Sequence, residues 1–175
     1  MSQENSDTHP SDYQSEVGAM DSILMQWRKE RPDIDPTPMA VCGQVWRASE
    51  ILRQGVIANW SNYDMDFAGS DVILTLRRQG RGATLSPSEL AKDMMLSTSA
   101  MTNRLDRLEK RGLVRRAMDP NDRRGLRIEL SDEGFALADE MIVGHVATEE
   151  QMLSVLTKSE RDQIRFLLGK IVKIT

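Results

Sequence analysis

Residues 97–127, STSAMTNRLDRLEKRGLVRRAMDPNDRRGLR, decide the fold of this 175-residue chain. The stretch predicts one helix followed by one hairpin, because its first serine is a good N-cap and Gly112 is a strong stop signal after two basic residues. Within the helix, Met101, Leu105 and Leu108 fall at positions i, i+4 and i+7. We therefore expect one narrow apolar stripe of this helix to be buried.

The face of this helix opposite the stripe begins with small polar residues and continues with arginine. Small hydrogen-bonding side chains at a helix N-terminus, backed by arginines, suit close approach to base edges and phosphates in a major groove. This face is therefore expected to read DNA. Its residues are Ser97, Thr98, Ser99, Ala100, Thr102, Asn103 and Arg107.

The segments on either side of this helix complete a recognisable unit. Residues 113–116 and 126–130 alternate apolar and polar side chains around a polar loop, which predicts two paired strands. Upstream, Ser86 to Glu89 reads SPSE, a capping box with proline at the first helical position, and this predicts a short preceding helix. Two helices followed by a basic hairpin indicate a winged helix-turn-helix.

The charge of the chain is distributed unevenly. The whole chain has 23 basic and 27 acidic residues, for a net charge of −4, yet residues 97–127 hold nine basic and four acidic side chains. A basic patch on an acidic body is typical of nucleic-acid binding and predicts a steep dependence of affinity on salt. The charge excess alone is equally consistent with a solvated hairpin.

The run SPSELAKDMMLSTSAMTNRLDRLEKRGLVRR followed by DPNDRRGLRIELSDEG resembles the winged helix of the MarR family of bacterial and archaeal transcriptional regulators. The strongest markers are DRLEKRGLV, the DRRG at 122–125 and LSDEG. The resemblance implies a homodimer that presents two DNA-reading helices to a palindromic double-stranded operator. It also implies that Arg123 and Arg124 reach a minor groove and that Asp122 orients the hairpin by pairing with Arg124.

The remaining sequence predicts a mainly α fold, in which helices flanking the winged helix-turn-helix form a dimerisation domain. We expect a disordered tail at 1–16, an extra N-terminal helix at 17–31, a DNA-binding domain at 67–130 and a helical dimerisation region at 37–63 and 131–175. The last helix carries an unbroken apolar stripe that needs a cover, for which the first long helix and a second subunit are the candidates. Its residues are Ile164, Leu167, Leu168, Ile171 and Val172.

Several classes of protein are disfavoured by what the sequence lacks. It shows no signal peptide, no apolar run long enough to cross a membrane and one cysteine, so we expect a cytoplasmic protein. With two histidines and no recognisable catalytic or phosphate-binding motif, we expect no enzyme, no metal site and no cofactor. A winged helix that serves only as a protein-interaction module, without binding DNA, is the alternative from another class.

Four further residues match the urate-responsive branch of the same family, the PecS and HucR type, which also has an added N-terminal helix bearing a tryptophan. The resemblance implies that Trp27 and Asp71 hold a purine, while Arg104 and Arg116 meet its negative charge. Stacking on indole and charge-assisted hydrogen bonds to guanidinium groups suit a flat anionic ring. We therefore expect a repressor that a small anionic aromatic ligand such as urate, or a related purine, releases from its operator.

Other interpretations of these residues stay open. Trp27 fits a core aromatic, Asp71 and Arg104 a structural ion pair, and Arg116 a phosphate contact. The rival sensor is Cys42, a redox candidate near the start of the first long helix, where the peroxide-sensing branch keeps its reactive cysteine. No obvious base stands near Cys42 in the sequence to lower the pKa of its thiol, and such a cysteine is commonly a small buried hydrophobe.

Overall fold

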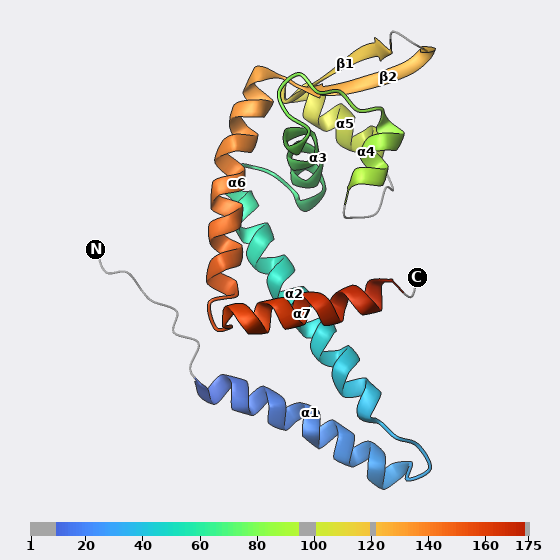
Figure 1. Ribbon diagram of the computed structural model, residues 1–175, viewed down its shortest axis with the longest axis vertical. Coiled ribbons are helices and arrows are strands. Elements are labelled where there is room, and N and C mark those ends of the chain that lie inside the picture. The colour runs from blue at the N-terminus through green and yellow to red at the C-terminus, as the bar shows by residue number, and fades with distance from the viewer. Residues whose placement is uncertain (1–9, 95–100, 120–121, 174–175) are drawn as a thin grey trace, which may run out of the picture. The chain divides into compact units, whose positions relative to one another are not determined.

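The computed structural model describes residues 10–94, 101–119 and 122–173, and for residues 10–17 and 122–124 it describes the backbone alone. The chain divides into two compact units, Met1–Ile51 and Leu52–Thr175. Figure 1 labels the helices and strands of both units.

The first unit holds α1 (Pro10–Glu30) and the beginning of α2 (Thr37–Ser61). α1 begins at Pro10 rather than at residue 17, so part of the segment assigned to the tail is helical, and proline suits a first helical position. α2 begins where the sequence predicts. The Asp35 carboxylate supports this start by accepting hydrogen bonds from the Thr37 backbone N–H at 3.0 Å and from its hydroxyl at 2.6 Å.

The second unit is built around α3. Its elements after α2 are α3 (Phe67–Arg78), α4 (Pro87–Asp93), α5 (Met101–Lys110), β1 (Val114–Asp119), β2 (Asp122–Leu130), α6 (Asp132–Met152) and α7 (Lys158–Val172). α3 contacts α4, α5, α6 and β2, and its side chains Val72, Ile73 and Leu76 are at most 1% exposed. α4, α5 and the β1–β2 hairpin around α3 form the predicted winged helix-turn-helix (Figure 1).

α5 is amphipathic as the sequence predicts. Met101, Leu105 and Leu108 are all buried in the core of the second unit. The helix ends at Lys110, and Gly112 follows with a φ of 73°, the left-handed conformation that favours glycine after a helix. The N-cap predicted at Ser97 lies outside the described residues.

The β1–β2 hairpin, called the wing below, is antiparallel, and both of its strands are longer than predicted. Val114 pairs with Leu130, and the register shifts between Met118 and Asp119. A single residue, Leu85, adds a short bridge to the wing by exchanging backbone hydrogen bonds of 3.0 and 2.7 Å with Ile128. One residue carries no alternation, so the sequence pattern does not reveal this bridge.

Side chains cap three helices at the predicted positions. Ser86 and Glu89 form the reciprocal capping box of α4, and Thr157 and Glu160 form that of α7. Ser131 caps α6, with its hydroxyl accepting a hydrogen bond from the Gly134 N–H at 2.9 Å. These local hydrogen bonds satisfy backbone donors that a helix start would otherwise leave unpaired.

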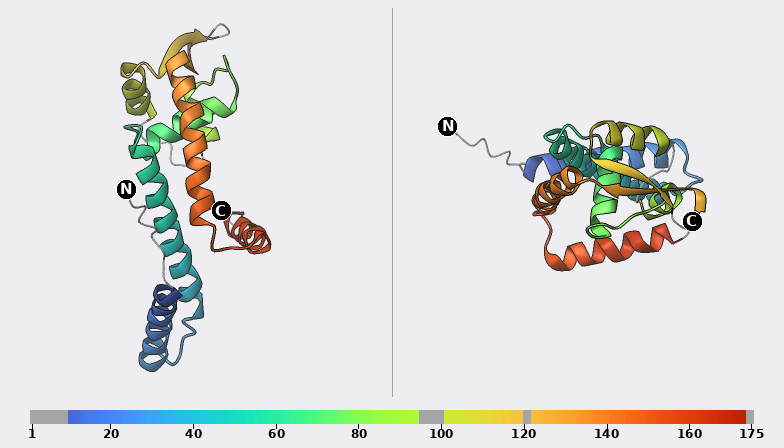
Figure 2. Two further views of the ribbon diagram at one scale, coloured as in Figure 1. Left: turned by 90° about the vertical axis from the view of Figure 1, so that its left-hand side faces the viewer. Right: turned by 90° about the horizontal axis from the view of Figure 1, so that it is seen from above.

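The apolar stripe of α7 is uncovered. The exposed fractions of Ile164, Leu167, Leu168, Ile171 and Val172 lie between 39% and 73%, and no described residue of α7 is buried. α7 turns away from the end of α6 (Figure 2). None of the helices among the described residues has the length and apolar character that crossing a membrane requires.

Candidate nucleic-acid interface and effector residues

The exposed face of α5 presents part of the predicted DNA-reading set. Thr102, Asn103 and Arg107 are exposed on the side of α5 away from its buried stripe. The predicted contacts at 97–100 lie outside the described residues. Arg123 and Arg124 belong to β2, near the tip of the wing, and their side chains are likewise outside the description, as is the proposed pairing of Asp122 with Arg124.

Arg107 is fixed to the start of α3 by an ion pair. Its Nη2 lies 2.8 Å from Asp66 Oδ2, while the other oxygen of Asp66 accepts a hydrogen bond from the Gly69 N–H at 2.7 Å and so caps α3. The Arg107 side chain is 63% exposed, so the pair is screened by water and easily exchanged for a phosphate. Asp66 therefore orients Arg107 without burying it.

Arg104 and Arg107 of α5, together with Arg111 just after its end, line a hollow of about 420 Å³. Their spacing of i, i+3 and i+7 places them on one side. The lining residues are Ser61, Asp64, Met65, Asp66, Gly69, Arg104, Arg107, Leu108 and Arg111. Arg111 is tied to the loop before α3, because its guanidinium donates to the carbonyl oxygens of Tyr63 and Asp64. The hollow is positively charged along its α5 wall.

Asp71 on α3 is partly buried, and its Oδ2, itself a buried atom, has no hydrogen-bond partner among the residues that the structure describes. Burial raises the pKa of the Asp71 carboxyl above its ordinary value, while the charges of Arg78 and Arg104 oppose this rise. The structure therefore brings two of the four predicted effector residues, Asp71 and Arg104, within electrostatic range of each other. An acceptor left unpaired in this way is suited to a donor from a ligand.

Arg116 of β1 is held by carboxylates of α5. Its Nη1 donates to Glu109 Oε2 at 2.8 Å and its Nη2 to Asp106 Oδ1 at 2.6 Å, and the side chain is 23% exposed. These contacts fasten the first strand of the wing to α5. Trp27, the fourth predicted effector residue, and Cys42, the redox candidate, both belong to the first unit, where Trp27 is 42% exposed and Cys42 is exposed as well.

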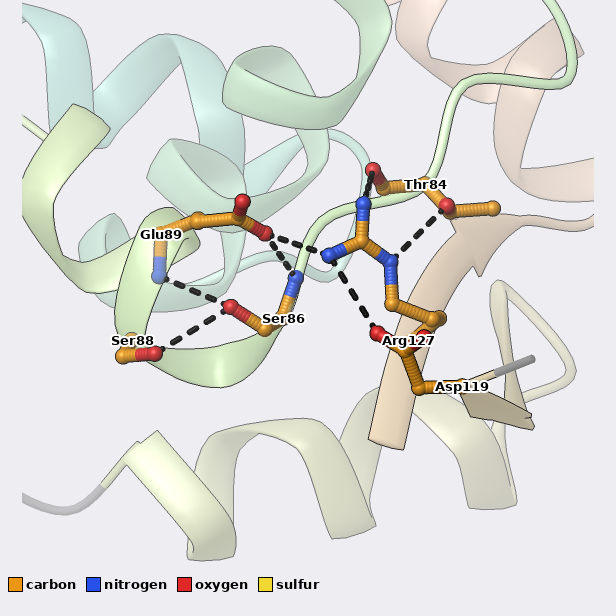
Figure 3. A network of polar contacts seen from close by, with 6 residues as sticks. All are labelled: Thr84, Ser86, Ser88, Glu89, Asp119 and Arg127. Carbon is orange, nitrogen blue, oxygen red and sulfur yellow. Dashed lines mark hydrogen bonds and ion pairs between the residues drawn. The ribbon is translucent and has the colours of Figure 1, made fainter. Parts of the chain in front are cut away.

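A polar network at the wing was not predicted from the sequence (Figure 3). Arg127 of β2 donates from Nε to Thr84 Oγ1 at 3.1 Å and from Nη2 to the Thr84 carbonyl oxygen at 2.9 Å. Its Nη1 donates to Glu89 Oε2 at 2.6 Å and lies 3.8 Å from Asp119 Oδ2. Strand alternation could have indicated that Arg127 faces away from its buried neighbour Ile128, but not which carboxylate it meets.

The described residues contain no group of three or more histidine, cysteine, aspartate or glutamate side chains that could hold a metal ion. Three arginine–carboxylate pairs of the second unit, Arg77–Asp139, Arg116–Asp106 and Arg127–Glu89, each join one element to another. The arrangement is that of a scaffold presenting a basic helix and hairpin.

Comparison with known proteins identifies the class of protein that this fold and surface define. The MarR family model matches residues 71–126. The HTH-type transcriptional regulator PecS of Dickeya dadantii is 40% identical over 151 residues, which cover 86% of this chain and 91% of that protein. The HTH-type transcriptional repressor MdtR of Bacillus subtilis is 33% identical over 58% of this chain and 64% of its own length. The chain belongs to the MarR family of transcriptional regulators, as its winged helix predicts.

Solved structures of DNA-binding proteins have a fold similar to that of this chain. BpsR of Bordetella bronchiseptica, described as regulated in its DNA binding by 6-hydroxynicotinic acid, is 25% identical, with a TM-score of 0.68 over 75% of this chain and 92% of that chain. A MarR variant from Escherichia coli in complex with operator DNA is 23% identical, with a TM-score of 0.67 over 83% of this chain and 96% of that chain.

Proposed function

We propose that this chain is a cytoplasmic, homodimeric repressor without catalytic activity, which binds a palindromic operator. The observation that carries the proposal is the amphipathic α5, which buries one apolar stripe and exposes Thr102, Asn103 and Arg107 on the side away from it. Such a helix fits a major groove, with the wing beside it at the phosphate backbone. The likeness to PecS along most of both chains supports the assignment.

Dimerisation supplies the second reading helix. A palindrome presents two half-sites about 34 Å apart, so two copies of α5 related by a twofold axis are needed to enter successive major grooves. The uncovered apolar stripe of α7 is a surface that a second copy would bury. The MarR variant bound to operator DNA shows that this fold is compatible with the duplex.

The experiment is a fluorescence-anisotropy titration of DNA flanking the protein's own gene over a series of salt concentrations. Replacing Arg107 and Arg124 together by alanine should weaken binding by at least tenfold and make the salt dependence shallower, because phosphate contacts are lost. Arg31→Ala, which removes an exposed arginine paired with Asp33 in the first unit, is the control. Unchanged affinity and slope in the double variant would overturn the proposal, and a wild-type chain with no salt-sensitive binding would favour the protein-interaction module.

We further propose that a small anionic aromatic ligand, such as urate or a related purine, releases the operator. Asp71 Oδ2, which no described residue pairs with, offers an acceptor for a ring N–H, and Arg104 supplies positive charge on α5 itself. Regulation of BpsR by 6-hydroxynicotinic acid shows that a relative of this fold responds to a small hydroxylated aromatic acid. Trp27 would stack on the ring, and Arg116 would exchange a carboxylate of α5 for the ligand.

Binding of the ligand and binding of DNA would then disfavour each other, because both involve α5. Moving Arg104 towards a ligand changes the position of the helix that carries Thr102, Asn103 and Arg107. By thermodynamic linkage, a ligand that lowers the affinity for DNA must itself bind more weakly to the DNA complex.

Titrating urate and related purines into the preformed DNA complex tests this effector. Release is expected from the wild type and should need at least about tenfold more ligand in Trp27→Ala and Arg104→Ala variants, because each loses a contact to the ring or its charge. Release that persists unchanged in both variants contradicts the effector site. Organic peroxide in the same assay tests the redox alternative, which predicts release that is lost in Cys42→Ser.

A further inference from the structure

Arg127 joins three segments that are separate in the sequence. Its guanidinium contacts Thr84 before α4, Glu89 in the first turn of α4, and Asp119 at the end of β1 (Figure 3). The side chains of Arg127 and Asp119 are 25% and 18% exposed. The planar, forked guanidinium suits this task, because it can donate in several fixed directions at once.

Glu89 links the wing to the helix-turn-helix through one oxygen atom. Its Oε2 accepts a hydrogen bond from Arg127 Nη1 and another, at 2.8 Å, from the Ser86 N–H that begins α4. The Ser86 backbone N–H is the main cause that lowers the pKa of the Glu89 carboxyl, and Arg127 adds to it. The carboxylate is therefore ionised at neutral pH, so the first turn of α4 and the wing share a charged acceptor.

The wing needs such an attachment because its outer part has little packing. An isolated two-stranded hairpin is only marginally stable in water. Val114 and Ile128 are buried near its root, whereas Met118 and Leu126, paired across the strands further out, are 64% and 41% exposed. Leu90 of α4 and Ile128 of β2 share the buried core near the root, and Arg127 adds polar contacts from β2 to Thr84 and Glu89.

We propose that Arg127 is a positioning residue that holds the wing against α4 and thereby sets the place from which Arg123 and Arg124 reach DNA. Arg127 itself does not bind DNA, because its donors are directed to Thr84 and Glu89. The proposal rests on the function proposed above and adds that Glu89 and Arg127 together hold β2 of the wing against α4, while Arg116 holds β1 to α5.

The variant Glu89→Gln separates this proposal from a direct contact of Arg127 with phosphate. Glutamine can still complete the capping box of α4 but does not carry the charge that binds Arg127. If Arg127 contacted phosphate, removing a competing carboxylate would leave the affinity equal or raise it. If Arg127 positions the wing, the same change should weaken operator binding about two- to fivefold, although it makes the protein less acidic.

The slope of affinity against salt provides the second readout. A displaced wing loses phosphate contacts, so Glu89→Gln and Arg127→Gln should both reduce the slope by roughly one or two units. Asp33→Asn is the matched control, because it also removes a carboxylate from an arginine pair but lies in the first unit. An unchanged or steeper slope in Glu89→Gln, with affinity retained or increased, would overturn the proposal.

Amide hydrogen exchange of the DNA-free protein tests the role of Arg127 independently of DNA binding. Amides of Leu126 and Ile128 should exchange at least about threefold faster in Glu89→Gln and Arg127→Gln, while amides of α3 keep their wild-type protection. Unchanged exchange in the wing would refute the role of Arg127, even for a protein that binds DNA as proposed. Faster exchange confined to the wing would support it, even if the wild type failed to bind the operator.

Discussion

Asp71 combines partial burial with an oxygen that finds no hydrogen-bond partner within the described parts of the chain. Excluding a carboxylate from water disfavours its charged form, and the nearby charges of Arg78 and Arg104 offset only part of this cost. A polar group kept at such a cost in stability is typical of a binding site, where a ligand supplies the missing partner. The same residue therefore predicts a measurable effect on stability in the absence of any ligand.

Asp71→Asn should stabilise the protein at neutral pH and leave its stability unchanged in acid. The pKa of Asp71 is raised in the folded state, so the wild type loses stability as the pH rises from about 4 through that raised pKa. The variant lacks this loss and should gain up to about 1 kcal/mol at pH 7, a modest figure because water screens a half-buried group. Urea denaturation between pH 4 and pH 8 measures the difference, and a difference that does not change with pH would contradict the prediction.

The arginines of the basic stretch divide into two groups that the sequence alone does not distinguish. Arg111, Arg116 and Arg127 are held by protein acceptors and are at most 37% exposed, whereas Arg107, although paired with Asp66, is 63% exposed. The count of charges predicts a basic surface. It does not show which arginine meets a carboxylate or carbonyl, because the acceptors of Arg111 and Arg127 come from segments distant in the sequence.

At the level of elements, α6 begins in direct contact with the root of the wing. The Ser131 N–H donates to the Leu113 carbonyl oxygen at 3.1 Å, and the Ser131 hydroxyl donates to the Gly112 carbonyl oxygen at 2.5 Å. A Cβ added to Gly134 would lie 1.9 Å from the Leu113 carbonyl oxygen. Neither the start of α6 nor the backbone at Leu113 can move apart without breaking these hydrogen bonds, so glycine is required at position 134.

Gly134→Ala should destabilise the second unit by about 2–4 kcal/mol, because the added methyl group overlaps backbone rather than a flexible side chain. Gly169→Ala on α7 is the control, since a Cβ there meets nothing within 4 Å. The control should keep or slightly raise the stability, because alanine favours a helix more than glycine does. Thermal unfolding followed by circular dichroism compares the two, and equal midpoints for both variants would refute the steric argument.

Local signals account for the elements that the sequence predicts correctly. α3 spans the expected 67–78, and the caps at Ser86, Ser131 and Thr157 depend on residues three or four positions apart. The bridge from Leu85 to Ile128 joins segments more than forty residues apart and leaves no local pattern. α6 ends at Met152 rather than near residue 156, a boundary for which the sequence offers no glycine or proline.

At the scale of the whole molecule, the uncovered face of α7 is the feature that a second copy would explain. Its stripe occupies five positions of one helix face, and all five are more than a third exposed. Monomeric soluble proteins rarely expose contiguous apolar patches of this kind without a function. The burial of this stripe would give the twofold arrangement that a palindromic operator requires.

Leu167→Lys should therefore raise the dissociation constant of the dimer by at least about tenfold, because an unpaired charge would be buried at the interface. Asp162→Lys, on the opposite face of α7, should leave the dimer intact. Sedimentation equilibrium of wild type and variants measures both constants. A wild type that sediments as a monomer, or a dimer insensitive to Leu167→Lys, would show that this stripe is not the interface.

The close contact between Gly134 and the Leu113 carbonyl oxygen couples the start of α6 to the root of the wing. The nine residues of β2 span about 30 Å, so a tilt of only about 5° carried from α6 into the wing moves the tip of the hairpin by roughly 3 Å, which is half the width of a minor groove. Because the two backbones are in close contact there, the junction between α6 and the hairpin cannot absorb such a tilt by local movement. A small reorientation beside α7 would then be enough to lift the arginines of the tip out of register with the duplex.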